Sequence, residues 1–391
     1  MDKIIVCHEE YYETSPELIT EVPGVCTLMG AFSDFCKGYC LTGTGSLALR
    51  VAISRRDDST ISLYDATRNE KKQFSLGSLK FKKDDKWVSY IKGALSQLIS
   101  DGYTVPCGLN ITLKGALLYC DNLTLSSAIS VGLLKALNEL FSFNIDNNTI
   151  IRISYQALNL YSKIHPRVRD LITMLYAEEG KVIYFDLTSM NYTLLDYPFS
   201  DSDNGGAFGI IVDPQIPPQI LRNDIEETRQ DAHDCCINLA KCITDGTPLR
   251  ELSIRELKSR VITGITEHER RTCEHVIVET AKVQKGVSFL EKGFAPGFGR
   301  ALSDIYISLR DTFNIICPEV DWLMKRASEV RDVYGGSLIS YGALGSLYLV
   351  LTKEAFEEYS QKFAEYEVIF GFKPETRIFY PHGPAKVVRI D

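Results

Sequence analysis

Two aspartates stand in surroundings that suit them for chemistry on a small polar molecule. Asp34 lies in the glycine-framed segment PGVCTLMGAFSDFCKGYCL, residues 23–41. Asp170 closes the segment HPRVRD and follows Arg167 and Arg169. A carboxylate can accept hydrogen bonds from two hydroxyl groups at once, or it can accept a proton. A neighbouring guanidinium would weaken Asp170 as a base, so the alternative interpretation is an aspartate paired with an adjacent arginine on the protein surface.

The cysteines favour reduced thiols over a disulfide framework or a zinc site. The chain has 11 cysteines, an odd number, with no CxxC pair. Cys36 and Cys40 come nearest to a ligand spacing. No histidine lies close to them in the sequence, and we therefore expect no metal there.

Composition narrows the classes of partner. The 391 residues are 45% hydrophobic and carry a net charge of −8 without long runs of one sign, which argues against nucleic acid or an anionic membrane as partner. A small molecule or a protein partner is expected instead. The N-terminus has no leader-like pattern and no stretch approaches 18 uninterrupted apolar residues, so we expect no membrane segment and a cytoplasmic protein.

Apolar periodicity predicts an α+β architecture. Strands are expected at 39–53, 60–64, 109–114, 181–187 and 211–213, and helices at 124–141, 149–164, 222–242, 266–290 and 298–330. Thr124 or Ser126 is expected to cap the helix at 124–141. A strand, helix and strand at 345–351, 354–364 and 376–380 suggest a split βαβ unit. The polar, glycine-rich segment 197–208 predicts a domain boundary.

Several segments together resemble galactokinases of the GHMP sugar-kinase superfamily. Residues 23–41 resemble the galactokinase signature PGRVNLIGEHTDYNGGYVL at the same spacing. Four further segments follow in family order: SVGLLKALNEL (130–140), HVIVETAKV (275–283), SLRDTFNIICPEVD (308–321) and GFKPETRIF (371–379). The resemblance covers residues 20–388.

This resemblance implies a two-domain GHMP kinase fold of α+β class. It implies an S5-like N-terminal domain at 1–200 and a ferredoxin-like C-terminal domain at 206–391, with sugar and nucleotide meeting in the cleft between them. It also implies ATP and Mg²⁺ as cofactors and a sugar-like ligand.

On the sugar side, the resemblance implies that Asp34 binds sugar hydroxyls. The positions of three other polar sugar contacts hold Ala31, Phe32 and Ile225. Apolar side chains cannot satisfy galactose, because each buried hydroxyl left unpaired costs about 1–3 kcal/mol. The resemblance therefore predicts a site less polar than a galactose site.

On the catalytic side, Asp170 falls at the position of the family's catalytic base. Its partner arginine is replaced by Val25. The family's phosphate loop is rich in glycine, which lets backbone N–H groups approach an anion at a helix N-terminus, but the corresponding segment 118–128 contains no glycine. Asp121 places a carboxylate in this segment, where it would oppose phosphate or simply cap the helix.

The remaining phosphate and metal positions are partly kept. Ser126 and Ser127 fall at the serines that face nucleotide and Mg²⁺, and Ser126 is the candidate metal ligand. The carboxylate that should share the metal is replaced by Leu158. Two glycines of the family's C-terminal motif survive, Gly342 and Gly345.

The losses favour a galactokinase-like protein that is non-catalytic or strongly impaired and keeps a cleft for a sugar-like or other small ligand. The alternative is an active ATP-dependent sugar kinase with altered specificity, which would use Asp170, Ser126 and Arg167 or Arg169. A third hypothesis is a purely structural subunit without a ligand.

Overall fold

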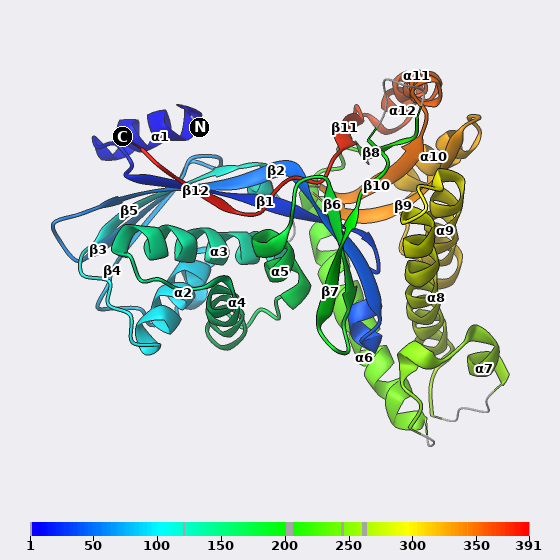
Figure 1. Ribbon diagram of the computed structural model, residues 1–391, viewed down its shortest axis with the longest axis horizontal. Coiled ribbons are helices and arrows are strands. Elements are labelled where there is room, and N and C mark those ends of the chain that lie inside the picture. Colours follow the sequence, from blue (N-terminus) through cyan, green and yellow to red (C-terminus); the bar gives the residue numbers. More distant parts are fainter. Residues whose placement is uncertain are drawn as a thin grey trace. The chain divides into compact units, whose positions relative to one another are not determined.

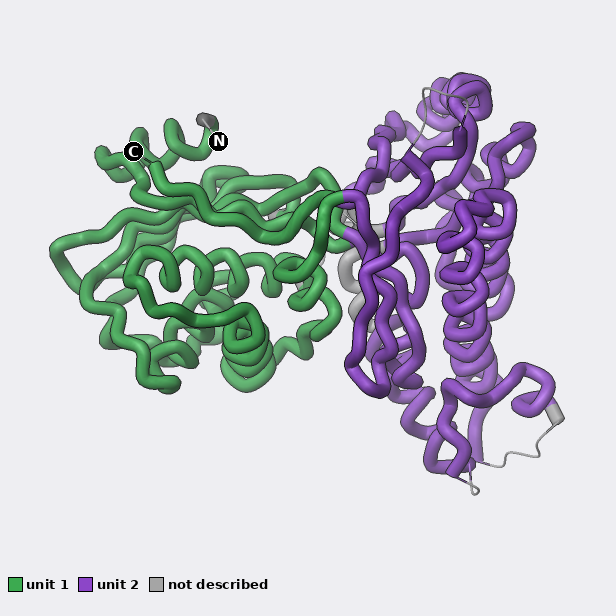
Figure 2. The backbone as a smooth tube through the Cα atoms, viewed as in Figure 1, with its two compact units in different colours: residues 1–25, 44–179, 382–391 green, residues 26–43, 180–381 purple. Residues whose placement is uncertain are grey.

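The computed structural model describes residues 2–119, 122–200, 206–243, 246–259, 264–341 and 343–390. The chain forms two compact units, shown in Figure 2. Unit 1 comprises residues 1–25, 44–179 and 382–391, and unit 2 comprises residues 26–43 and 180–381. The domain ranges 1–200 and 206–391 remain a prediction. Residues 201–205, in the middle of the expected boundary, lie outside the described residues.

The sheet of unit 1 has the strand order β12-β1-β2-β5-β3-β4. The strands are β1 (Leu18–Met29), β2 (Tyr39–Arg55), β3 (Thr60–Asp65), β4 (Glu70–Ser75), β5 (Leu109–Gly115) and β12 (Lys386–Arg389). The described pairs are antiparallel except β3 with β5, which run parallel. The predicted strands at 39–53, 60–64 and 109–114 are confirmed as β2, β3 and β5.

Helices cover both faces of this sheet, as Figure 1 shows. They are α1 (Asp2–Tyr12) on one face, and α2 (Val88–Ser100), α3 (Asn122–Phe141), α4 (Asn147–Gln156) and α5 (Val168–Tyr176) on the other. Alternation along β2 explains both contacts, because successive side chains of a strand point to opposite faces. Leu49, Val51 and Ile53 join the large core beneath α2–α5, whereas Ala52 packs with Ile4 of α1.

Unit 2 contains a four-stranded sheet in the order β11-β8-β10-β9. Its strands are β8 (Phe208–Asp213), β9 (Val333–Tyr341), β10 (Ala343–Leu351) and β11 (Glu375–Phe379). Since β10 and β11 both pair antiparallel with β8, they run parallel to each other with β8 between them. The split βαβ arrangement is therefore confirmed. In the same unit, β6 (Lys181–Asp186) pairs with the first residues of β2 and with β7 (Asn191–Asp196).

The helices of unit 2 are α6 (Pro218–Cys242), α7 (Ile254–Ser259), α8 (Glu267–Leu290), α9 (Ala295–Ile307), α10 (Pro318–Ser328), α11 (Lys353–Ser360) and α12 (Phe363–Phe370). The start of α8 is set by a capping box, in which Thr266 accepts from the Glu269 backbone and Glu269 accepts from the Thr266 backbone. Within the described residues, no helix is both long and apolar enough to span a membrane.

Several helix boundaries differ from the predictions. The helix expected at 124–141 begins at Asn122, so Thr124 and Ser126 lie inside it and the expectation that one of them caps it is wrong. The helix expected at 149–164 gives way to a π-helical turn at Ala157–Tyr161. The segment 298–330 is divided into α9, a π-helical turn and α10, because Pro318 opens a new helix.

Candidate functional site

The glycine-framed segment of unit 2 forms a tight loop and a short 3₁₀ helix, Ser33–Cys36. Gly30 has a positive φ of 87°, and a Cβ atom there would lie 2.5 Å from the carbonyl oxygen of Tyr39. A Cβ at Gly38 would lie 2.5 Å from Thr280 Oγ1. Both glycines are therefore required by close approach, and they hold the loop that carries Asp34.

A buried carboxylate supports the start of this loop. Glu279 of α8 accepts hydrogen bonds from two successive backbone N–H groups, Ala31 at 2.9 Å and Phe32 at 2.8 Å. Glu279 is only 2% exposed. Each carboxylate oxygen thus accepts one hydrogen bond, as a buried polar group requires. The loop backbone is thus positioned by an acidic side chain from a distant helix.

An arginine of α6 engages the carboxylate of Asp34. Arg229 Nη2 donates to Asp34 Oδ2 at 3.0 Å, and Arg229 Nη1 donates to the Ala31 carbonyl oxygen at 2.8 Å. The guanidinium also lies over the rings of Phe32 and Phe35, at 5.4 and 5.0 Å from their centroids. Asp34 is therefore part of an ion pair that locks the loop against α6.

The ring of Phe32 belongs to a buried aromatic cluster. It meets Phe313 edge to face at 5.0 Å and His275 at 5.6 Å, and His275 stacks on Phe313. His275 Nδ1 lies 3.0 Å from Ser308 Oγ, and burial lowers the pKa of His275 to about 3. Phe32 thus makes packing contacts. The side chain of Ile225, the third apolar replacement, lies outside the described residues.

In unit 1, Asp170 lies in the first turn of α5 and is 1% exposed. Arg167 Nε donates to Asp170 Oδ2 at 2.8 Å, and Arg169 Nε lies 3.7 Å from Asp170 Oδ1. Arg167 also donates through Nη2 to Thr124 Oγ1 in the first turn of α3, at 3.1 Å. Both arginines are buried. The aspartate–arginine pair predicted from the sequence is present, but its expected place on the surface is wrong, because all three side chains are buried.

The two serines at the predicted nucleotide positions are also buried. Ser126 Oγ donates to the Leu123 carbonyl oxygen at 3.1 Å, and neither Ser126 nor Ser127 has exposed surface. Val25 and Leu158, at the predicted arginine and carboxylate positions, are buried apolar side chains. Asp121, whose carboxylate was expected near this helix, lies outside the described residues.

The C-terminal glycine motif is described only in part. Gly345 lies in β10 with a φ of 94°, where the pairing of β10 with β9 shifts register between Ala343 and Ser346. A glycine is favoured at such a bulge because it tolerates positive φ. Gly342 lies outside the described residues. Asp34 and Gly345 belong to unit 2, whereas Asp170, Ser126 and Ser127 belong to unit 1.

Comparison with known proteins identifies the relatives of this chain. It is 28% identical over 380 residues to a putative galactokinase of Treponema pallidum, which covers 95% of this chain and 93% of that protein. It is 26% identical over 354 residues to a galactokinase of Clostridium perfringens, which covers 90% of each chain. The crystal structure of Lactococcus lactis galactokinase complexed with galactose superimposes with a TM-score of 0.87 at 18% identity, covering 98% of this chain and 99% of that one. The chain is a galactokinase homologue. No protein-family model matches it.

The galactokinase fold expected from the resemblance is thus confirmed. Mg²⁺ prefers several hard oxygen ligands. Ser126 Oγ is buried and bonded within its own helix, and Leu158 supplies no oxygen. These two side chains do not fit a magnesium ion.

Sequence reasoning missed Arg229 and Glu279. A signal for Glu279 exists, because it shares a helical stripe with His275, Val276 and Val283, all of them buried. A carboxylate on an apolar stripe needs a partner. Arg229 gives no comparable signal, because it lies in a helix segment rich in charged residues.

Proposed function

We propose that this galactokinase homologue is non-catalytic or strongly impaired as a kinase and binds a sugar-like or other small ligand. The observation that carries the proposal is the buried ion pair of Arg167 with Asp170, at 2.8 Å. Asp170 stands at the position of the family's catalytic base. A base must be available to a substrate hydroxyl, and this carboxylate is instead held between two buried guanidinium groups.

Releasing Asp170 from Arg167 would cost free energy. Separating a buried ion pair leaves an uncompensated charge and typically costs about 3–5 kcal/mol. That penalty would be added to the barrier of any reaction that uses Asp170 as a base, and each 1.4 kcal/mol lowers a rate about tenfold. The pair therefore argues against efficient phosphoryl transfer.

The contacts of Asp34 support the ligand part of the proposal. Its ion pair with Arg229 removes one acceptor position from a sugar hydroxyl, and Ala31 and Phe32 offer no polar side chain nearby. The Lactococcus lactis galactokinase was solved with galactose. We expect this chain to bind galactose weakly and to prefer a ligand with fewer hydroxyl groups. ATP and Mg²⁺ enter the proposal by resemblance only.

A coupled assay of ADP release tests the proposal. Protein, galactose, ATP and Mg²⁺ are combined, and the Asp170→Ala variant is measured alongside. We expect turnover far below ~1 per second, the lower end of ordinary enzyme rates. Turnover above that value that disappears in Asp170→Ala would overturn the non-catalytic assignment. Calorimetric titration with galactose gives a second readout, in which micromolar or tighter binding would contradict the weak-binding expectation.

One observation favours the alternative, an active kinase of altered specificity. Arg167 reaches Thr124 in the first turn of α3, the helix that follows the phosphate loop in family order. A cation at a helix N-terminus could assist phosphate binding where glycines are absent. The same ADP-release assay with a panel of sugars distinguishes this alternative, because it requires turnover with one acceptor and loss of that turnover in Arg167→Gln.

A protein partner and a cytoplasmic location complete the proposal. The described cysteines are free thiols, which suits a reducing compartment.

Thermal-shift measurements with sugars, ATP and Mg²⁺ would separate a ligand-binding protein from a purely structural subunit, which should show no shift with any of them.

A further inference from the structure

We propose that Asp231, Cys235 and His268 of unit 2 form a zinc-binding site that joins helices α6 and α8. This inference is independent of the proposed function. Asp231 and Cys235 are four residues apart in α6, so their side chains lie one above the other on the same helix face. His268 is the second residue of α8.

The three ligand atoms are already close together. His268 Nε2 lies 2.7 Å from Asp231 Oδ2, and Cys235 Sγ lies 3.9 Å from Asp231 Oδ1. The potential ligand atoms all lie within 4.8 Å of one another. In a tetrahedral zinc site, neighbouring ligand atoms are ~3.3–3.8 Å apart. The longest separation in the cluster therefore needs to shorten by roughly 1 Å, and the 2.7 Å between His268 Nε2 and Asp231 Oδ2 needs to lengthen.

The exposure of Asp231 and His268 makes that rearrangement feasible. Cys235 is 3% exposed and is therefore fixed by packing. The side chains of Asp231 and His268 are 47% and 63% exposed, so they can change rotamer without disturbing the core. A metal at this place would bind to one fixed ligand and two adjustable ones.

The ligand set identifies the class of metal. A thiolate, an imidazole and a carboxylate suit Zn²⁺, whereas Mg²⁺ prefers oxygen ligands alone. On binding, the thiol releases its proton to solvent, His268 binds through the lone pair of a neutral ring nitrogen, and Asp231 binds as the carboxylate. The two negative charges then balance the charge of the ion.

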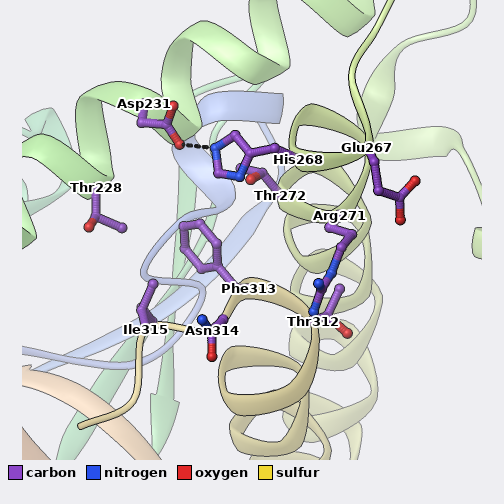
Figure 3. Close-up of a pocket in the computed structure, with 10 residues that line it drawn as sticks. All are labelled: Thr228, Asp231, Glu267, His268, Arg271, Thr272, Thr312, Phe313, Asn314 and Ile315. Atoms are coloured by element: carbon purple, nitrogen blue, oxygen red, sulfur yellow. Dashed lines mark hydrogen bonds and ion pairs between the residues drawn. The ribbon is translucent and has the colours of Figure 1, made fainter.

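A pocket of about 600 Å³ lies beside the cluster and is lined by Asp231 and His268 among others. Figure 3 shows these two side chains in contact near Thr272, with the ring of Phe313 drawn just below His268. Three protein ligands leave the fourth zinc position open, and the pocket has room for a water molecule there. The site thus has the ligand count of a zinc centre that keeps one exchangeable position.

Metal titration of the intact chain tests the proposal. Protein treated with a chelator is dialysed and titrated with Zn²⁺ in competition with a chromophoric chelator, and separately with Co²⁺. We expect one Zn²⁺ per chain, and a thiolate-to-cobalt charge-transfer band in the near ultraviolet. Loss of an outer-shell partner commonly lowers metal affinity 10–100-fold, so loss of a ligand in Cys235→Ser or His268→Ala should lower it at least about 100-fold.

Matched variants on the same helix serve as controls. His233 and Cys242 also lie in α6, and His233 contacts Asp234 instead of the cluster. His233→Ala and Cys242→Ser should bind zinc like the parent chain. Because Cys235 is buried, Asp231→Asn supplies a test at an exposed position, and circular dichroism checks folding. Absence of stoichiometric zinc, or equal affinity in Cys235→Ser and the parent chain, would overturn the proposal, as would a cobalt complex without the charge-transfer band.

Discussion

Arg229 and Asp34 are separated by 195 positions in the chain, yet their side chains meet with 3.0 Å between Nη2 and Oδ2. The same guanidinium donates to the Ala31 carbonyl oxygen. One side chain of α6 thus binds both the Asp34 carboxylate and the backbone of the loop between Gly30 and Gly38, here called the signature loop. The conformation of this loop therefore depends on α6 as well as on its own glycines.

Replacing Arg229 should destabilise unit 2. Arg229→Met removes two charge-assisted hydrogen bonds at a partly exposed position, and we expect the free energy of unfolding to fall by about 1–3 kcal/mol in urea denaturation. Arg310→Met is the control, because Arg310 pairs with neighbouring Asp311 at the surface and should change stability by less than about 1 kcal/mol. Equal losses in the two variants would show that the Arg229 contacts contribute no more to the free energy of unfolding than a surface ion pair does.

The pair of Arg167 and Asp170 should show strong coupling in a double-mutant cycle. Asp170→Leu leaves two buried guanidinium groups without their carboxylate and should lower the free energy of unfolding by about 3–5 kcal/mol. The double variant Arg167→Met/Asp170→Leu should lose less than the sum of the single changes, by about 0.5–3 kcal/mol. Urea denaturation of all four proteins measures this difference. Strictly additive effects would contradict a direct interaction.

Acid should destabilise the protein through two buried histidines. Burial lowers the pKa of His8 to about 4 and that of His275 to about 3, from an ordinary value of 6.5. Below pH 6.5 each of these histidines binds a proton in the unfolded chain but stays neutral in the folded protein. Their contribution to stability is therefore complete above pH 6.5 and declines as the pH falls towards the pKa values of the folded protein. At pH 5 each histidine should account for a loss of about 2 kcal/mol.

The variant His275→Gln isolates one of these contributions. Its free energy of unfolding should fall by about 2 kcal/mol less than that of the parent chain between pH 7.5 and pH 5, because glutamine does not titrate. An unchanged dependence in His275→Gln would mean that His275 is not buried in its neutral form.

Gly38 should tolerate no side chain. In Gly38→Ala the new Cβ would lie 2.5 Å from Thr280 Oγ1 and 2.8 Å from Thr280 Cγ2, and we expect a loss of about 1–3 kcal/mol in the free energy of unfolding. Adding Thr280→Ala should recover part of that loss. Gly383→Ala is the control, since no atom lies within 4 Å of a Cβ there. A stable Gly38→Ala variant would show that the loop shifts freely.

Local pattern determined much of the fold. The alternating apolar residues of β2 have the period of a strand, and the apolar stripe of α3 has the period of a helix. Each period can be recognised within its own segment of the sequence. The spacing of Gly30, Asp34 and Gly38 likewise pointed to one loop of a known fold. The ion pair of Arg167 and Asp170 was also within reach of the sequence, because residues three apart meet at the start of a helix.

Helix ends were less accessible to sequence reasoning. Thr124 and Ser126 are plausible caps by residue type, but α3 begins two residues before Thr124. The residue types that cap helices also occur inside them, where a hydroxyl can bond to the preceding turn as Ser126 does to the Leu123 carbonyl oxygen. Residue type alone therefore does not fix the boundary.

The sequence by itself thus determined the elements, the signature loop and the loss of polar side chains at family positions. Only the tertiary structure decided the partners of Asp34 and of the loop backbone, Arg229 and Glu279, and the meeting of Asp231 with His268. Periodicity and capping act within a few residues, so they can be read along the chain. Contacts between α6, α8 and the loop depend instead on how whole elements pack, and side-chain type alone does not select one partner among the many that the chain offers.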